Sequence, residues 1–96
     1  MVTITFSWDD GKAEGNLRKR GVSFQEAMTA FGDPNARVKH GPDHSQEEDR
    51  FLLLGFSARL RILLVAHTYR RDEKEIRIIS ARRATKNESR QYGSFL

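Results

Sequence analysis

The chain of 96 residues contains no cysteine, only two prolines and a single tryptophan. The absence of cysteine excludes disulfide bonds, a thiolate metal site and a cysteine nucleophile. The longest apolar run, Ile62 to Ala66, is far too short to span a membrane. The N-terminus lacks the basic segment and the apolar stretch of a signal peptide. These absences predict a soluble, cytoplasmic protein that does not use a membrane as its partner.

Acidic residues are also scarce in the C-terminal part of the chain. Residues 1–56 contain seven Lys/Arg and nine Asp/Glu, a net charge of −2, whereas residues 57–96 contain ten and four, a net charge of +6. Nucleic acid is the commonest partner of such a basic segment. An anionic membrane surface is a less suitable partner, because the basic residues fall in predicted strands rather than on a long amphipathic helix.

The N-terminal half is predicted to contain one strand and two helices. Apolar and polar residues alternate over residues 2–7, which is typical of a strand with one buried face. Asp9 can cap a helix that ends at Gly21 in the left-handed conformation. Ser23 and Glu26 form a capping box that begins a second helix.

The rest of the chain is predicted to contain four strands and one helix. Strands are expected at residues 36–39, 50–57, 61–69 and 75–81. Short connections favour antiparallel pairing of the last three. Thr85 and Glu88 form another capping box, which begins a short final helix. We therefore expect residues 1–96 to form one α+β domain, with two N-terminal helices packed on an antiparallel sheet and a short C-terminal helix.

One face of this sheet is expected to be partly open, since the helices cover only the other face. In the strand at 61–69, Leu64 and Ala66 share one face, while His67 and Tyr69 share the other. The second face becomes polar towards the end of the strand, so we expect it to be a platform for nucleic acid. The alternative for His67 is a half-exposed strand residue hydrogen-bonded to a neighbour.

The run Arg77-Ile78-Ile79-Ser80-Ala81-Arg82 places an arginine at each end of an apolar strand core. In a regular strand, residues five apart point to opposite faces. Arg82 is expected where the strand ends, which frees it to point to either face. Guanidinium groups beside a helix start are well suited to bind phosphate. The alternative is that both arginines are solvated or pair with Glu75 and Glu88.

Two other patterns have simple structural explanations. Trp8 lies beside a capped helix and is expected to be a core anchor rather than a base-stacking residue. The loop at residues 40–44 contains His40, Asp43 and His44. Ligands so close together on a Gly-Pro loop rarely give tetrahedral geometry, so we expect no metal site there.

A set of motifs spread over most of the chain is found together in one known family. The motifs are Trp8-Asp9, Lys12, Asn16, Gly21-Val22-Ser23-Phe24, Ala27, Phe31-x-Asp33, Glu48-x-Arg50, Gly55, Thr68-x-Arg70, the run from Arg77 to Arg82 with Ala84, Glu88 and Tyr92. In these motifs the sequence resembles the BrnT toxins, the toxin half of a bacterial type II toxin–antitoxin pair. The resemblance implies one RelE-like ribonuclease domain over residues 1–96. Where the family usually has Lys-His-Gly, this chain has Lys19-Arg20-Gly21, and arginine cannot act as a base.

The resemblance implies RNA cleavage without a metal ion or cofactor, in which the ribose 2′-hydroxyl attacks its own phosphate. The protein then supplies a proton acceptor, a proton donor and cations for the developing charge. The candidate base is His67 or Glu48, and Arg77 and Arg82 are the candidate charge stabilisers. The candidate RNA-binding residues are Lys12, Lys19, Arg20, Arg50, Arg70, Arg83 and Tyr92.

The resemblance also implies partners and a cellular effect. Cleavage of RNA would inhibit translation, and a cognate BrnA-like antitoxin would neutralise the toxin. Operator DNA would be contacted only through the antitoxin complex. The alternative is a non-catalytic basic module that binds nucleic acid or a partner protein through the same arginines.

Overall fold

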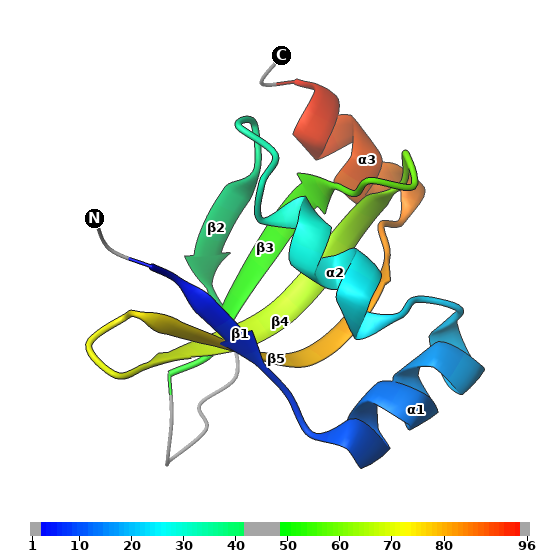
Figure 1. Ribbon diagram of the computed structural model, residues 1–96. Helices are drawn as coiled ribbons and strands as arrows, with labels where there is room; N and C mark the ends of the chain where they lie inside the picture. Colours follow the sequence, from blue (N-terminus) through cyan, green and yellow to red (C-terminus); the bar gives the residue numbers. More distant parts are fainter. Residues whose placement is uncertain (1–2, 42–48, 95–96) are drawn as a thin grey trace.

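Five strands form one sheet in the computed structural model, which describes residues 3–41 and 49–94. The strands are β1 (Thr5–Ser7), β2 (Arg37–His40), β3 (Phe51–Phe56), β4 (Ile62–Arg70) and β5 (Glu75–Arg83). Their order across the sheet is β1-β5-β4-β3-β2 (Figure 1). Together with three helices they give the mixed α+β fold that the sequence predicts.

The direction of β1 differs from the prediction of a fully antiparallel sheet. Strands β2 to β5 are antiparallel to their neighbours, but β1 pairs with β5 in parallel. The short loops that join β3 to β4 and β4 to β5 impose an antiparallel direction on these strands. No such loop joins β1 to β5, because both N-terminal helices and three strands lie between them in the sequence. Sequence patterns could not specify this pairing.

The first helix has the predicted ends. Helix α1 (Asp10–Arg20) begins after Asp9, whose carboxylate accepts a hydrogen bond from the Lys12 amide at 2.9 Å. It ends at Gly21, which has a φ of 70° and donates its N–H to the carbonyl of Leu17. The other helices are α2 (Phe24–Ala30) and α3 (Lys86–Gly93). Within the described part of the chain, no helix is long and apolar enough to cross a membrane.

The start of α2 departs from the predicted capping box. Ser23 accepts a hydrogen bond from the Glu26 amide, but the Glu26 carboxylate does not return to the cap. It is buried and accepts hydrogen bonds from the Arg61 guanidinium and, at 2.7 Å, from the Ser57 hydroxyl. The hydrogen bond from Arg61 lowers the pKa of Glu26 and outweighs the effect of burial. A tertiary ion pair thus replaces half of a local motif and ties α2 to the turn between β3 and β4.

Helix α2 covers one face of the sheet, crossing in front of β3 and β4 in Figure 1. The Trp8 ring packs edge-on against Phe24, with ring centroids 5.9 Å apart, which confirms the expected core anchor. The buried core cluster consists of Val22, Phe24, Ala27, Ala30, Leu53, Leu63, Val65, Ile78 and Ala81. Helix α1 lies along β5 at the side of this core.

The helices cover the face of β4 that we expected to be open. Leu63, Val65 and His67 are fully buried, so the prediction of an open polar face at His67 is wrong. The face that α1 and α2 leave uncovered carries Leu64 and Ala66. Both faces of β4 have similar apolar content, and alternation alone does not indicate which one a helix covers. The choice depends on neighbouring strands, which the local pattern does not include.

Gly55 is expected to tolerate no side chain, because β3 and α2 approach closely there. A Cβ atom at Gly55 would lie 2.9 Å from the carbonyl oxygen of Ala30 and 2.9 Å from a methyl carbon of Leu53. We expect Gly55→Ala to destabilise the fold by about 1–3 kcal/mol, measured by thermal melting. Gly15→Ala is the control: a Cβ there meets nothing within 4 Å, and alanine favours α1. A Gly55→Ala protein that melts at or above the wild-type temperature would contradict this packing.

Candidate nucleic-acid interface

A β-bulge in β5 determines where its side chains point. Ala66 of β4 pairs with Ser80, but the next residue of β4, His67, pairs with Ile78. Ile79 is therefore an extra residue on β5 that has no partner in this pairing. One extra residue reverses the alternation of side chains along the rest of the strand.

The bulge brings two of the predicted site arginines onto the same face. Arg77 pairs opposite Thr68 and Arg82 pairs opposite Leu64, and these two residues of β4 share a face. The expectation for a regular strand, in which residues five apart point to opposite faces, therefore does not apply. Strand β5 also continues to Arg83, so Arg82 lies within the strand rather than beyond its end.

Arg82 is held by Glu88 from the first turn of α3. Its guanidinium donates to both carboxylate oxygens, at 2.8 and 2.9 Å, and to the carbonyl of Arg83 at 3.2 Å. This is one of the two pairings considered as the alternative to phosphate binding. Three of the five guanidinium N–H groups are thus used, and the other two have no partner within residues 3–41 and 49–94. Arg82 is therefore oriented but still able to bind an anion.

Glu88 connects Arg82 to the cap of α3. Its carboxylate accepts the Thr85 N–H at 2.9 Å, and its own N–H donates to the Thr85 hydroxyl at 3.1 Å, which confirms the predicted capping box. The hydrogen bonds from Arg82 lower the pKa of Glu88 to about 2, with a smaller contribution from the Thr85 amide. Glu88 is therefore ionised at neutral pH and holds the Arg82 guanidinium in one orientation.

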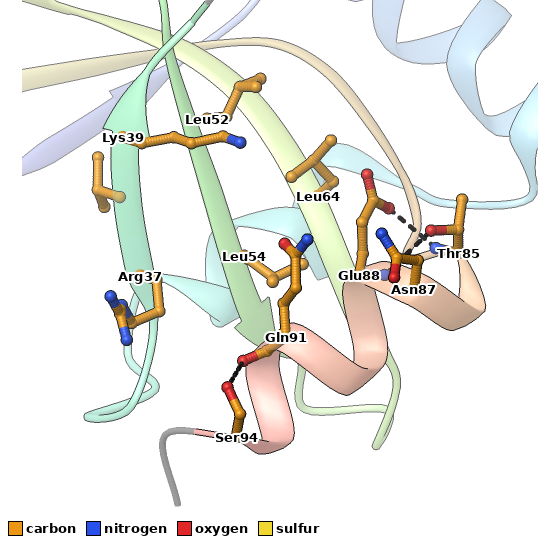
Figure 2. Close-up of a pocket in the computed structure, with 11 residues that line it drawn as sticks. Arg37, Lys39, Leu52, Leu54, Leu64, Thr85, Asn87, Glu88, Gln91 and Ser94 are labelled. Carbon is orange, nitrogen blue, oxygen red and sulfur yellow. Dashed lines mark hydrogen bonds between the residues drawn. The ribbon is translucent and has the colours of Figure 1, made fainter.

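The uncovered face of the sheet contains a groove beside α3, which we call the α3 groove (Figure 2). Its floor is formed by Leu52 and Leu54 of β3 and Leu64 of β4. Strand β2 forms one wall and α3 the other. The walls consist of Arg37, Val38, Lys39, Thr85, Asn87, Glu88, Gln91 and Ser94.

Two further hollows extend this surface to α1. The second hollow shares Leu52 and Leu64 with the α3 groove and is also lined by Arg20 and Arg82. The third shares Arg20 with the second and is also lined by Lys12 and Lys19 from α1. The other residues of these two hollows are Asp9, Gly11, Gly15, Asn16, Ala66, Ile79, Ser80 and Ala81. We call the four cations Lys12, Lys19, Arg20 and Arg82 the basic strip. They line adjoining hollows, so a linear polyanion can contact them in succession.

The remaining predicted cations lie away from the basic strip. Arg77 and Arg50 lie at the end of the sheet where β5 and β3 begin, and Arg70 ends β4 there. Glu75, the other acid considered as a partner for Arg77, instead binds Arg71, at 3.2 Å. Arg83 pairs opposite Leu63, whose face is the helix-covered one, and is exposed at the end of the sheet.

Two predicted site residues, Tyr92 and His67, are buried in this structure. Tyr92 is 6% exposed and donates its hydroxyl hydrogen to the Asp33 carboxylate at 2.6 Å, so it anchors α3 rather than presenting a ring for stacking. This hydrogen bond raises the pKa of Tyr92 to about 12. His67 is 0% exposed, and its Nδ1 and Nε2 lie 3.1 Å from the Val65 carbonyl and 3.2 Å from the Tyr69 hydroxyl. A role for His67 as the base stays a prediction and requires that its ring be uncovered.

Burial of His67 leads to a specific pH dependence of stability. Burial lowers the pKa of His67, opposed by its hydrogen bond to the Val65 carbonyl. Below about pH 6.5 the unfolded chain therefore binds a proton at His67 more readily than the folded chain does. The contribution of His67 to the free energy of unfolding is lost as the pH falls below this value. We expect the melting temperature to fall between pH 7 and pH 5, and His67→Gln to reduce this slope. His40→Gln is the substitution control, because the His40 side chain is 62% exposed. An unchanged slope in His67→Gln would contradict this assignment.

Three residues named in the sequence predictions lie outside the described part of the chain. They are Glu48, the second candidate base, and Asp43 and His44 of the loop considered for metal binding. Within residues 3–41 and 49–94 no group of three or more His, Asp or Glu side chains could hold a metal ion. The neighbour of Glu48, Asp49, accepts a hydrogen bond through its carbonyl from Thr68, at 2.8 Å.

Sequence reasoning missed four residues of the α3 groove. Arg37 and Lys39 alternate with Val38 along β2, so they point to one face of the strand. Asn87 and Gln91 are four residues apart on α3 and share a face of that helix. Both spacings are visible in the sequence, but only the packing of α3 beside β2 and β3 shows that the two pairs face one groove.

Comparisons with known proteins identify the family of this chain. The family model described as "ribonuclease toxin, BrnT, of type II toxin-antitoxin system" matches residues 8–88. Among solved structures, the crystal structure of the Brucella abortus ribonuclease toxin BrnT is similar, with a TM-score of 0.64 and 23% sequence identity. That match covers 88% of this chain and 100% of the other and shows a shared fold. A comparison with curated proteins finds no match. Because the family model spans most of the sequence, the chain belongs to the BrnT family, the ribonuclease toxins of type II toxin–antitoxin systems.

Proposed function

We propose that this chain is one RelE-like toxin domain, residues 1–96, that cleaves RNA in the cytoplasm without a metal ion and so inhibits translation. The observation that carries the proposal is the basic strip. Its cations come from α1 and from β5, two elements far apart in the sequence, and they line adjoining hollows. Several cations along one path can contact successive phosphates of an RNA strand.

In the proposed reaction the nucleophile belongs to the substrate. The ribose 2′-oxygen attacks the adjacent phosphorus, the bond from phosphorus to the 5′-oxygen breaks, and the products carry a 2′,3′-cyclic phosphate and a 5′-hydroxyl. A base takes the proton of the 2′-hydroxyl, and the leaving 5′-oxygen receives a proton. Negative charge grows on the phosphoryl oxygens in the transition state, so a fixed cation there accelerates the reaction.

Arg82 is the residue best placed to stabilise that charge. Glu88 fixes its orientation, and two N–H groups remain to donate to a phosphoryl oxygen. Arg77 lies on the same face of β5 but near the start of the strand, so we assign it to binding a more distant phosphate of the same RNA. Arg20, which replaces the family's usual histidine, lines the same hollow as Arg82. It stays protonated, so we assign it to phosphate binding and not to proton transfer.

The proton acceptor is assigned to Glu48 in preference to His67. A carboxylate is ionised at neutral pH and can therefore accept a proton. His67 is fully buried, and its ring nitrogens contact Val65 and Tyr69. Glu48→Gln should therefore slow cleavage without weakening RNA binding.

The test is single-turnover cleavage of end-labelled RNA by the purified protein, with and without EDTA. We expect cleavage in both conditions and products ending in a cyclic phosphate. Binding of RNA without cleavage would favour the alternative, a non-catalytic basic module. Loss of cleavage in EDTA would contradict the metal-free mechanism.

Membership of the family implies an antitoxin partner, and we propose that a BrnA-like antitoxin neutralises this chain by covering the basic strip. Operator DNA would then be contacted only through the complex. Expression of the chain alone should slow bacterial growth, and co-expression of the antitoxin should restore it. Normal growth with abundant, folded protein and no antitoxin would contradict the proposed toxicity.

A further inference from the structure

The α3 groove is suited to hold a single flat ring. It has a volume of about 430 Å³, within the range of small-ligand pockets. The floor of Leu52, Leu54 and Leu64 is apolar and half-buried or buried. The walls, in contrast, carry cations from β2 and hydroxyl and amide groups from α3. An apolar floor with polar groups at the rim binds a planar molecule that has a polar edge.

The α3 wall of the groove carries two side-chain amide groups. Asn87 and Gln91 are both exposed and lie one helical turn apart. In Figure 2 the Gln91 side chain extends over the groove beside Leu54, and Asn87 lies next to Glu88. Within residues 3–41 and 49–94 the Gln91 amide has no hydrogen-bond partner, and Asn87 accepts only a 3.5 Å contact from Arg90. Each amide presents a donor and an acceptor side by side, the pattern that pairs with the edge of a nucleobase.

The groove is continuous with the basic strip. Leu52 and Leu64 belong both to its floor and to the hollow that contains Arg82. Glu88 lines the groove and also holds Arg82 at 2.8 Å. A nucleotide whose phosphate is bound by Arg82 can therefore place its base in the groove. Lys39 on the opposite wall can bind the next phosphate.

From these observations we infer that the α3 groove is a nucleobase pocket, in which Gln91 and Asn87 read the edge of a base next to the cleaved phosphate. The inference rests on the proposed function and names the specificity-determining residues of the same site. The floor is aliphatic, so selectivity comes from hydrogen bonds to the base edge rather than from aromatic stacking. A protein helix that covered the groove with apolar side chains would leave both amides buried and unpaired, which is costly.

The test is equilibrium binding of short 2′-O-methyl oligoribonucleotides that differ at one base. These probes lack the attacking hydroxyl, so the measurement does not depend on cleavage. We expect the wild-type protein to prefer one base by about tenfold or more, and Gln91→Ala and Asn87→Ala to reduce this preference. Gln25→Ala is the matched control: this exposed glutamine is on α2, away from the groove, and should keep the wild-type preference.

Three results would overturn the inference. The first is wild-type binding without base preference, and the second is a preference that persists in both groove variants. The third is equal weakening for all four bases, which would indicate a backbone contact only. If the variants instead lose affinity for the antitoxin and keep the base preference, the groove is a protein-docking site. Failure of the proposed function would give a different result. In that case RNA with free 2′-hydroxyl groups would not be cleaved, whether or not the 2′-O-methyl probes show a base preference in binding.

Discussion

Replacing Arg82 with alanine is expected to reduce single-turnover RNA cleavage by about a hundredfold or more, the usual scale for loss of one transition-state charge contact. Arg82 lies on the uncovered face of β5, with its guanidinium fixed by two hydrogen bonds to Glu88. No other cation of the basic strip is held by a carboxylate in this way within the described residues. The remaining cations should therefore preserve most RNA binding, while the chemical step slows.

The fold is expected to survive this substitution. The Arg82 side chain is 34% exposed and its ion pair with Glu88 is partly solvated, so its loss should cost about 1 kcal/mol or less. Glu88 keeps its hydrogen bonds with Thr85, so α3 stays capped. Melting temperature and circular dichroism of the variant check this expectation. A large fall in melting temperature would mean that any loss of activity reports unfolding.

Two matched variants separate charge from orientation. Arg82→Lys keeps the charge but cannot make two parallel hydrogen bonds, so we expect an intermediate rate. Glu88→Gln can keep the cap of α3 and does not change Arg82 itself. It replaces the two hydrogen bonds from the Arg82 guanidinium to a carboxylate with a weaker contact to an amide. Its rate should also be intermediate, with RNA affinity unchanged or higher because a negative charge is removed. Full cleavage activity in Arg82→Ala would contradict the arginine mechanism.

The largest effect on stability is expected at Asn16. Its side-chain amide, on α1, donates to the carbonyls of Val22 and Ala81, both at 2.9 Å, and its oxygen accepts the Ala81 N–H at 3.1 Å. Asn16 is 8% exposed. Strand β1 pairs only with residues 75–77 of β5, so the edge of β5 at Ala81 has no neighbouring strand. The asparagine takes the place of that strand and satisfies both backbone groups of Ala81.

We expect Asn16→Ala to destabilise the fold by about 3 kcal/mol or more, because it leaves the buried N–H and C=O of Ala81 without partners. For a chain of this size the melting temperature should fall by about 12 °C or more. Asn35→Ala, in an exposed loop, is the control and should change stability by less than about 0.5 kcal/mol. A wild-type melting temperature in Asn16→Ala would mean that water or a backbone shift replaces these bonds.

Features that depend on neighbouring residues in the sequence were predicted correctly. Asp9, Gly21 and the pair Thr85–Glu88 lie at helix ends because their side chains or backbone suit those positions whatever surrounds them. The positions of the strands and the mixed α+β class follow from local hydrophobic patterns in the same way. The motif pattern also indicated the BrnT family, which the family model confirms.

Features that depend on distant residues could not be predicted. The parallel pairing of β1 and the choice of covered face depend on contacts between segments far apart in the chain. These contacts place His67 in the core and turn the Glu26 carboxylate towards Arg61 rather than its own helix cap. Tyr92 is likewise buried because Asp33, 59 residues away, accepts its hydroxyl hydrogen.

The sequence shows which cations are available to the proposed RNA-binding surface, and the tertiary structure decides which of them lie together. The sequence alone indicated an excess of cations in the C-terminal part and candidate phosphate-binding residues at Arg77 and Arg82, whereas three of the four cations of the basic strip come from α1 in the N-terminal half. Only the bulge at Ile79 puts these two arginines on one face, and only the packing of α1 against β5 brings Arg20 beside Arg82. The physical reason is range: charge and helix capping act over a few residues, whereas strand register and the choice of buried face result from packing across the whole sheet.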